Sequence, residues 1–234
     1  MKWKIVHIDE TDSTNRWLKD HGEGTMVVAT DYQTAGKGCG SNAWESERGK
    51  NLTFSMLIHP DGIAAREQFR ITEVVSVALC RTLQPYIYNK VEIKWPNDIY
   101  VGDRKLCGIL IENRLQGNVI VDCIIGIGLN VNQRVFLSDA PNPVSMYQLT
   151  GQETDRGAIL ADFLRTFDEV MASETAAQDY RLRLYRSTGF YAFEDAGGRF
   201  LAEIVRVEAD GRFVLKDKTG QERTYAFKEI KYII

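Results

Sequence analysis

Cysteine, proline and histidine are scarce in this sequence. It has four cysteines, five prolines and three histidines among 234 residues. The cysteines stand far apart and form no CxxC pair, so neither a sequence-local zinc site nor a disulfide framework is indicated. This cysteine usage is typical of a reduced, cytoplasmic protein, which is the localisation that we expect.

An excess of charge of one sign is also missing. Lysine and arginine number 29 against 32 aspartates and glutamates, which gives a net charge of −3 without any long basic run. A nucleic-acid-binding surface usually has a basic stripe that displaces counterions from phosphates, so no nucleic-acid partner is expected. The N-terminus lacks the apolar core of a signal peptide, and no apolar window is long enough to cross a bilayer. No membrane partner is therefore expected either.

The apolar residues that are present predict a mixed α/β region followed by a small β-rich region. Apolar runs predict strands at 26–30, 52–58, 91–95, 105–113 and 119–130. Helical spacing predicts helices at 14–19, 64–83, 159–171 and 179–187, and Ser13 would cap the first through its hydroxyl. Short runs at 200–207, 212–216 and 223–227, with Asp210-Gly211 as a hairpin turn, suit a small β-barrel. We therefore expect two domains, residues 1–187 and 188–234.

The most specific local pattern is the run Lys94-Trp95-Pro96-Asn97-Asp98. Proline removes a backbone donor and restricts the residue before it, so the strand should end in a fixed turn from which Asn97 and Asp98 project. An amide and a carboxylate at a sheet edge can hold a metal–phosphate complex or orient an incoming amine. The alternative is that Pro-Asn-Asp is simply a good turn.

Two further patterns place cations and glycines where an anion could bind. Lys105 opens the apolar strand Lys-Leu-Cys-Gly-Ile-Leu, in which Gly108 indicates close approach by a ligand or another backbone. In the stretch Gly36-Lys37-Gly38-Cys39-Gly40, alternate glycines expose backbone N–H groups that can wrap an anion. Trp44, just beyond, could stack on a base or anchor the loop. The alternatives are a solvated strand-end lysine and a surface loop, since the spacing fits neither a P-loop nor a GxGxxG fingerprint.

Together these patterns occur in the order found in biotin protein ligases. The chain resembles that family from about Ile8 to Asn130, most clearly in the KWPND run and the KLxGIL strand. The resemblance implies an α+β fold: a mixed β-sheet with helices, like the catalytic domain of class II aminoacyl-tRNA synthetases, and a small C-terminal SH3-like β-barrel. It implies that ATP, with Mg²⁺, activates biotin as biotinyl-5'-AMP. Biotin would then pass to a lysine of a biotin carboxyl carrier protein, in acetyl-CoA carboxylase or a related carboxylase.

The resemblance also implies roles for the matching residues. Lys105 would reach the biotin carboxylate and the α-phosphate, and Asp98 would assist metal–phosphate binding or accept the proton of the acceptor lysine. The residues implied to bind biotin are Ser13, Thr14, Asn15, Gln33, Gly36, Lys37, Gly38, Lys105, Gly108, Gly126 and Gly128. Those implied to bind ATP and the adenylate are Lys37, Gly38, Cys39, Trp44, Asn97, Asp98, Lys105, Leu129 and Asn130. No structural metal is expected.

Two departures from the family pattern are visible. The family loop usually carries several arginines, whereas Cys39 and Asn42 stand here where a cationic or longer polar residue is common, and Lys37 is the only cation between residues 36 and 42. Only a dozen residues precede Ser13, which leaves no room for the N-terminal helix-turn-helix domain with which some members repress genes. We therefore expect no repressor activity, and we leave open whether the protein is a homodimer.

Three other mechanisms compete with this interpretation. A lipoate or octanoate ligase or transferase of the same fold is disfavoured by the KWPND run. A non-catalytic biotin sensor is disfavoured because both Lys105 and Asp98 are retained. Octanoyl transferases on related folds form an acyl-thioester on a cysteine, which makes Cys107 a candidate nucleophile. Cys107 shares a face with Lys105 only if the strand is regular there, and we favour a small buried residue that packs.

Overall fold

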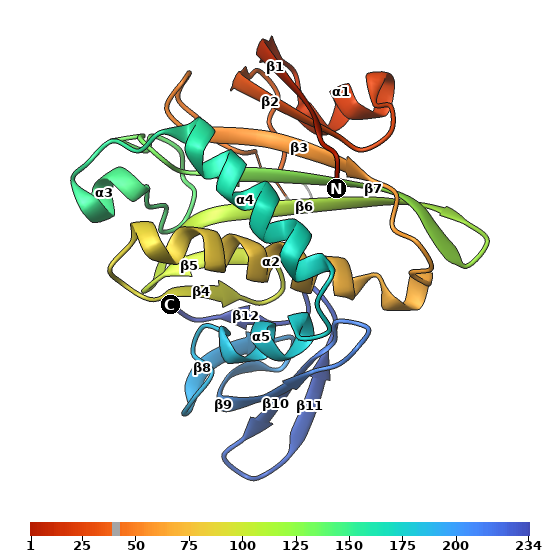
Figure 1. Cartoon of the computed structure of the whole chain (residues 1–234). Coiled ribbons are helices and arrows are strands. Elements are labelled where there is room, and N and C mark those ends of the chain that lie inside the picture. The colour runs from red at the N-terminus through yellow and green to blue at the C-terminus, as the bar shows by residue number, and fades with distance from the viewer. Residues whose placement is uncertain (39–42) are drawn as a thin grey trace.

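The computed structural model describes residues 1–38 and 43–234 and contains two β-sheets (Figure 1). The first has seven strands in the order β1-β2-β3-β7-β6-β5-β4. Only β1 and β2 run parallel, so the sheet is mixed, as expected. Its strands are β1 (Lys4–Thr11), β2 (Met26–Gln33), β3 (Leu52–Ile58), β4 (Val91–Lys94), β5 (Asp98–Val101), β6 (Arg104–Gln116) and β7 (Val119–Leu129).

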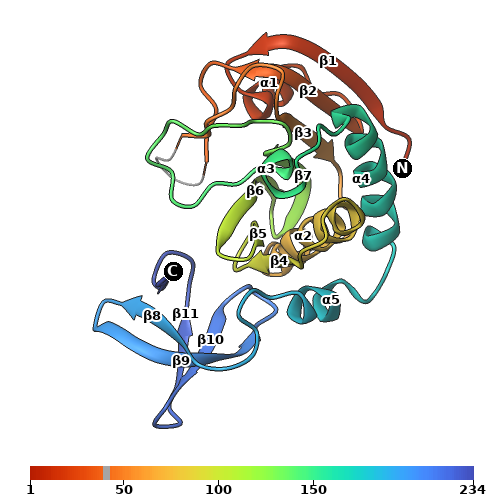
Figure 2. The same cartoon turned by 90° about the vertical axis from the view of Figure 1, so that its left-hand side faces the viewer.

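Helices cover both faces of this sheet. The long helices α2 (Phe69–Leu83) and α4 (Arg156–Met171) lie together over one face (Figures 1 and 2), and the short helix α1 (Thr14–His21) packs on the opposite face against β2, β3 and β7. Side chains alternate between the two faces along a strand. Val27 accordingly packs in the core under α2 and α4, while Val28 packs with Leu18 of α1. The remaining helices are α3 (Met146–Thr150) and α5 (Ala176–Leu182).

The second sheet has five antiparallel strands in the order β11-β10-β9-β8-β12. They are β8 (Tyr191–Asp195), β9 (Gly198–Val207), β10 (Phe213–Asp217), β11 (Glu222–Tyr225) and β12 (Lys231–Tyr232). The expected β-rich region is present with its turn at Asp210-Gly211, but the closed SH3-like barrel is not confirmed. Trp95 joins the two sheets: its ring stacks on Phe213 with centroids 4.7 Å apart, and its indole Nε1 donates to the Gly211 carbonyl at 3.0 Å.

Several boundaries differ from the expectation, each for a physical reason. Strand β1 was missed because it is a largely exposed edge strand without apolar alternation. Strand β5 was missed because it has only four residues, directly after the Pro-Asn turn. Helix α2 begins at Phe69 rather than at residue 64, after the 3₁₀ turn Ala65–Glu67, and α5 occupies Ala176–Leu182 rather than 179–187.

The start of α1 also corrects an expectation. Ser13 is the N-cap residue by position, but its hydroxyl makes no capping hydrogen bond. Instead, the Thr14 backbone N–H at the helix start donates to Gln33 Oε1 of β2 at 2.8 Å. A side chain from a neighbouring strand thus satisfies a donor that helix ends leave unpaired. Across both described stretches, no helix combines the length and apolarity needed to span a membrane.

Candidate functional site

A cleft of about 880 Å³ lies at the end of the first sheet and extends to the second sheet. Its walls come from the start of α1, the end of β2, the β4–β5 hairpin, the first half of β6, the end of β7, the loop around residue 140 and the β11–β12 turn. The predicted residues that line it are Ser13, Thr14, Asn15, Gln33, Lys37, Gly38, Trp44, Asn97, Asp98, Lys105, Gly108, Gly126, Gly128 and Asn130.

Two predicted residues, Leu129 and Gly36, are not among those that line the cleft, and a third, Cys39, is not described. Leu129 is fully buried, because strand alternation turns its side chain to the core face of β7, and its assignment to the nucleotide site stays a prediction. Gly36 lies behind the cleft wall, where a Cβ would lie 2.9 Å from Gln33 Nε2 and 3.1 Å from the Trp44 carbonyl oxygen. Cys39, together with Asn42, lies outside the described residues.

Glycines form the floor of the cleft, and Trp44 lies directly on it. Gly108 and Gly128 face each other across the β6–β7 pair. A Cβ at Gly128 would overlap the Trp44 indole, and a Cβ at Gly108 would lie 3.1 Å from Trp44 Cζ3. The indole Nε1 is buried and has no hydrogen-bond partner among the described residues. A flat aromatic ring with an unused donor over a floor without side chains suits a planar ligand.

Polar side chains without charge, those of Thr14, Asn15 and Gln33, line one end of the cleft, and the charged groups Glu112 and Lys37 lie nearby. The Thr14 Oγ1 hydroxyl lies 3.0 Å from Gln33 Oε1, and Asn15 Nδ2 donates to Glu112 Oε2 at 2.8 Å. The side chain of Asn15 lies over Gly126, where any Cβ would overlap it. Thr14 and Asn15 are nearly fully buried, so this end can pair a ligand's donors and acceptors away from competing water.

The other end of the cleft carries charge. Lys105 Nζ lies 2.7 Å from Asp98 Oδ1, with both side chains only partly exposed. Lys94 Nζ lies 5.1 Å from the ring centroids of both Tyr100 and Tyr232, and burial lowers its pKa although nearby Asp98 opposes that shift. Asn97 Nδ2 donates to the Ile109 carbonyl at 2.7 Å, which fixes the turn beside them. Ammonium groups held in a partly desolvated cleft suit an anionic group such as a phosphate or carboxylate.

An irregularity in β6 places Lys105 on the cleft side and Cys107 in the core. The pairing of β5 with β6 shifts register, so that Tyr100 pairs with Lys105 and Ile99 with Cys107. Lys105 Nζ thereby comes to within 3.3 Å of where a Cβ of Gly108 would lie. Cys107 is fully buried, and burial raises the pKa of its thiol well above the usual range. A thiolate nucleophile is therefore not available there, which confirms the packing interpretation.

The structure also brings in residues that the sequence did not single out for the site. Tyr100 and Phe136 line the cleft, as do Lys228, Lys231 and Tyr232 of the second sheet. Lys228, Lys231 and Tyr232 lie in a segment without a clear sequence pattern, so their position at the cleft could be found only from the tertiary structure. Lys94 was part of the KWPND motif, but its side chain had been given no role. Across the described residues, no three His, Cys, Asp or Glu side chains gather as a metal site.

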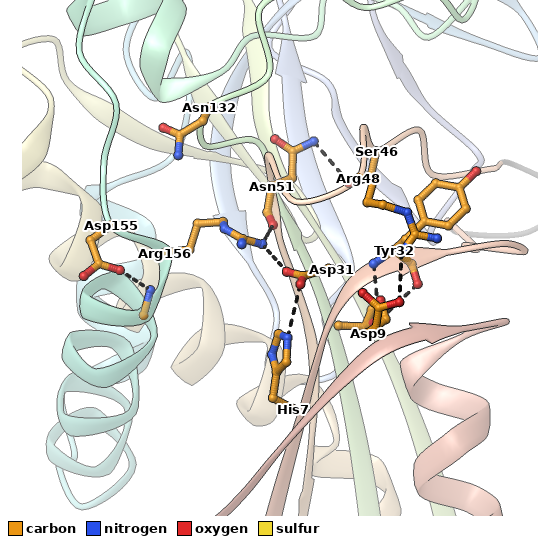
Figure 3. Close-up of polar contacts among 12 residues, drawn as sticks. His7, Asp9, Asp31, Tyr32, Ser46, Arg48, Asn51, Asn132, Asp155 and Arg156 are labelled. Carbon is orange, nitrogen blue, oxygen red and sulfur yellow. Dashed lines mark hydrogen bonds and ion pairs between the residues drawn. The ribbon is translucent and has the colours of Figure 1, made fainter.

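Ion pairs hold in place the segment that follows Trp44 (Figure 3). Arg48 pairs with Asp9 and Glu10 of β1 and lies over the Tyr32 ring, 4.8 Å from its centroid. Asp31 accepts from Arg156 of α4 at 2.9 Å and lies 3.3 Å from His7 Nε2. Residues 45–51 therefore lead into β3 along contacts with its neighbours: Arg48 meets β1 and β2, and the Arg156 guanidinium of α4 also donates to the Asn51 carbonyl at 3.1 Å.

Comparison with known proteins establishes the family. Residues 7–130, just over half of the chain, match the model of the biotin/lipoate A/B protein ligase family. The chain belongs to this family. The same stretch contains the glycine floor, the polar end and the Lys105–Asp98 pair, so the family domain supplies most of the cleft.

Individual members of this ligase family resemble the chain over most of its length. It is 29% identical to the bifunctional ligase/repressor BirA of Bacillus spizizenii, over 94% of this chain and 70% of that protein. It is 27% identical to the biotin–[acetyl-CoA-carboxylase] ligase of Mycobacterium tuberculosis, over 91% of this chain and 84% of that protein. The chain spans between 49% and 70% of the length of the ligase/repressors of Bacillus and Escherichia coli that it matches.

A solved structure shows the same fold. The biotin protein ligase from Aquifex aeolicus in complex with biotin and ATP superposes with a TM-score of 0.81, covering 98% of this chain and 99% of that one at 22% identity. The arrangement of helices around the mixed sheet is thus that of the biotin protein ligase structures.

Proposed function

We propose that this protein is a biotin protein ligase, which activates biotin with ATP and transfers it to a lysine of a biotin carboxyl carrier protein. The observation that carries the proposal is one continuous cleft with a polar end, a glycine floor beneath Trp44, and the Lys105–Asp98 pair. The solved relative from Aquifex aeolicus holds biotin and ATP together, which supports the same two ligands here.

The cleft suits the first half-reaction, adenylation. The biotin carboxylate oxygen attacks the α-phosphorus of ATP, the bond to the β-phosphate oxygen breaks, and pyrophosphate leaves with that electron pair. Lys105 would hold the biotin carboxylate beside the α-phosphate and stabilise the charge that develops during displacement. Lys94 would add positive charge on the same side, and the Trp44 ring would stack on the adenine.

The second half-reaction transfers biotin to the carrier. The amine of the acceptor lysine attacks the carbonyl carbon of biotinyl-5'-AMP, an amide bond forms, and AMP leaves with the electrons of the broken acyl–phosphate bond. The amine must lose a proton in this step. Asp98 is a carboxylate of the cleft that lies next to Lys105, and it can accept that proton.

The residues present fit a Mg²⁺ ion that arrives bound to ATP. Mg²⁺ usually keeps several waters and takes one or two carboxylates plus substrate phosphates. Asp98 can supply such a carboxylate, and Asn97 lies beside it in the same turn. When bound, the ion would neutralise phosphate charge during adenylation.

The polar end of the cleft favours biotin over lipoate or octanoate. The ring system of biotin contains a urea group with donors and an acceptor, whereas the corresponding end of lipoate or an octanoyl chain is apolar. An apolar ligand could not pair the hydrogen-bonding capacity that Thr14 and Gln33 keep beyond their contacts with each other, and each buried group left unpaired costs about 1–3 kcal/mol. The buried, protonated Cys107 disfavours an acyl-thioester route as well.

The decisive experiment is transfer of labelled biotin to a purified carboxyl-carrier domain. We expect label on the carrier only when ATP and Mg²⁺ are present, and none on a carrier whose acceptor lysine is changed to arginine. A non-catalytic biotin sensor would bind biotin without labelling the carrier, and a lipoate ligase would transfer labelled lipoate instead. Either of those results would overturn the proposal.

Three features of the whole protein remain part of this proposal. We infer a domain boundary at residues 187 and 188, since the first sheet and its helices end at Leu182 and the second sheet begins at Tyr191. The five antiparallel strands are consistent with a small barrel. The acceptor would be a carrier domain of acetyl-CoA carboxylase or a related enzyme, as the name of the Mycobacterium tuberculosis relative suggests.

A further inference from the structure

A fully buried serine lies beneath the polar end of the cleft. Ser55, in the middle of β3, has no exposed surface and does not line the cleft itself. It faces Gly126 of β7 across the sheet, and because Gly126 lacks a side chain, Asn15 can lie there and reach Ser55. Ser55 Oγ is 2.6 Å from Asn15 Oδ1 and 2.6 Å from Thr14 Oγ1.

The hydrogen bonds of this cluster can be ordered by counting protons. Ionised Glu112 can only accept, so its bond to Asn15 fixes Nδ2 toward Glu112 and leaves Oδ1 facing Ser55. Ser55 must then donate its one proton to Asn15 Oδ1, because that oxygen has no proton of its own. The Thr14 hydroxyl has one proton and two oxygens within reach, Ser55 Oγ at 2.6 Å and Gln33 Oε1 at 3.0 Å. Because the Ser55 proton is used on Asn15, the shorter of these two contacts requires Thr14 to donate to Ser55.

The Glu112 carboxylate, which fixes the order of these hydrogen bonds, is held in place by an ion pair. Lys19 Nζ lies 2.7 Å from Glu112 Oε1. Burial alone would favour the neutral acid, but the hydrogen bonds from Lys19 and Asn15 outweigh it and lower the pKa of Glu112. Glu112 therefore remains an acceptor at neutral pH.

Thr14 and Gln33, at the other end of this chain of hydrogen bonds, line the cleft and can contact a ligand. Because its proton is used within this cluster, the Thr14 oxygen can only accept from a ligand in the cleft. Gln33 Oε1 accepts from the Thr14 backbone N–H and also lies 3.0 Å from the Thr14 hydroxyl, so the amide nitrogen of Gln33 remains as the donor. A ligand must offer an N–H to Thr14 and an oxygen to Gln33, and a cyclic urea does both.

We propose that Ser55 and Glu112 are positioning residues, which fix the donor and acceptor pattern of Thr14 and Asn15 and thereby select a cyclic urea at this end of the cleft. Neither residue touches the reacting atoms. The proposal rests on the proposed function, because it assumes that biotin is the ligand that enters this end.

The test compares Ser55→Ala with Ser76→Ala, which removes the hydroxyl of another fully buried serine. Ser76 lies on α2, away from the cleft, and its hydroxyl has no partner within the described parts of the chain. The measurements are calorimetric dissociation constants for biotin and desthiobiotin, which share the urea ring, together with KM for ATP and the melting temperature.

We expect Ser55→Ala to weaken binding of both urea ligands by about tenfold or more, since a buried polar group loses its partner. KM for ATP should stay unchanged, and Ser76→Ala should bind both ligands like the wild type. Ser55→Thr, which keeps the hydroxyl, should recover most of the affinity. Affinity within twofold of wild type for Ser55→Ala, or an equal rise in KM for ATP, would overturn the proposal.

A double-mutant cycle tests whether the two residues act together. Glu112→Gln gives Asn15 a partner that can both donate and accept, so the order of the hydrogen bonds is lost without loss of volume. Both changes break the same chain of hydrogen bonds. The double variant Ser55→Ala/Glu112→Gln should therefore bind biotin about as weakly as whichever single variant binds biotin less tightly. Effects that multiply would show two independent sites and refute the proposal. A wild-type protein that binds no biotin would instead refute the proposed function.

Discussion

The buried carboxylate of Glu73 gives a quantitative test of the energetics of the fold. Glu73 lies on α2 with only 8% of its surface exposed. Burial raises its pKa from 4.5 to about 6, although Arg181 and Arg70 favour the charged form. The folded protein therefore holds a proton on Glu73 more tightly than the unfolded chain does.

The sign and size of the effect follow from linkage. Since the folded pKa is the higher one, stability decreases as the pH rises from about 4.5 to about 6 and then levels off. A shift of about 1.5 pKa units corresponds to about 2 kcal/mol at 1.36 kcal/mol per unit. Glu73→Gln cannot titrate, so it should gain about 2 kcal/mol relative to the wild type between pH 4 and pH 7.5. For a chain of this length that is about 4–8 °C in melting temperature.

Urea unfolding of both proteins at several pH values measures this difference. The constant cost of burying the amide cancels, because only the change of the difference with pH is used. The matched control is Glu67→Gln, which changes an exposed glutamate just before α2 and should leave the pH profile as in the wild type. A difference between Glu73→Gln and the wild type that does not vary with pH would refute the reasoning.

Three further predictions concern the cleft. Lys105→Ala should lower the rate of adenylate formation by about 10²–10³-fold with the fold intact, because it removes a group that stabilises developing charge. Arg104→Ala changes an exposed neighbour and should leave that rate unchanged. Measuring the rate of pyrophosphate release by both variants tests this prediction. Cys107→Ala should keep ATP-dependent biotin transfer within a few-fold of wild type, and a trapped biotinyl-thioester would contradict this. Gly128→Val should displace the Trp44 ring and raise KM for ATP while circular dichroism stays native; an unchanged KM would show that Trp44 does not hold the nucleotide.

Local patterns predicted five of the seven strands of the first sheet, and candidate site residues that line the cleft, because those patterns depend on short segments. The strand at 52–58 matches β3 at both ends, and Asn97, Asp98 and Lys105 do line one cleft. The sequence could not show the register shift in β6 that turns Lys105 toward the cleft and Cys107 away from it. Regular alternation would have placed Lys105 and Cys107 on the same face of the strand.

Residues that depend on long-range packing were not predictable. In the sequence, nothing distinguishes Ser55 from other polar residues of buried strands. Its role follows only from the position of Asn15, which lies over Gly126 and contacts Ser55. Lys228 and Lys231 reach the cleft only because Trp95 stacks on Phe213 and fixes the second sheet beside the KWPND hairpin. In both cases the contacting residues are far apart in the sequence, so no local sequence pattern could predict the contact.

The central claim is that one cleft binds biotin and ATP and joins them. Exchange of labelled pyrophosphate into ATP, measured without any carrier protein, tests it most directly because exchange requires reversible formation of the adenylate. We predict exchange that depends on biotin, saturates with it, and is nearly lost in Lys105→Ala. Biotin-independent exchange, or no exchange by a protein that binds both biotin and ATP, would contradict the claim.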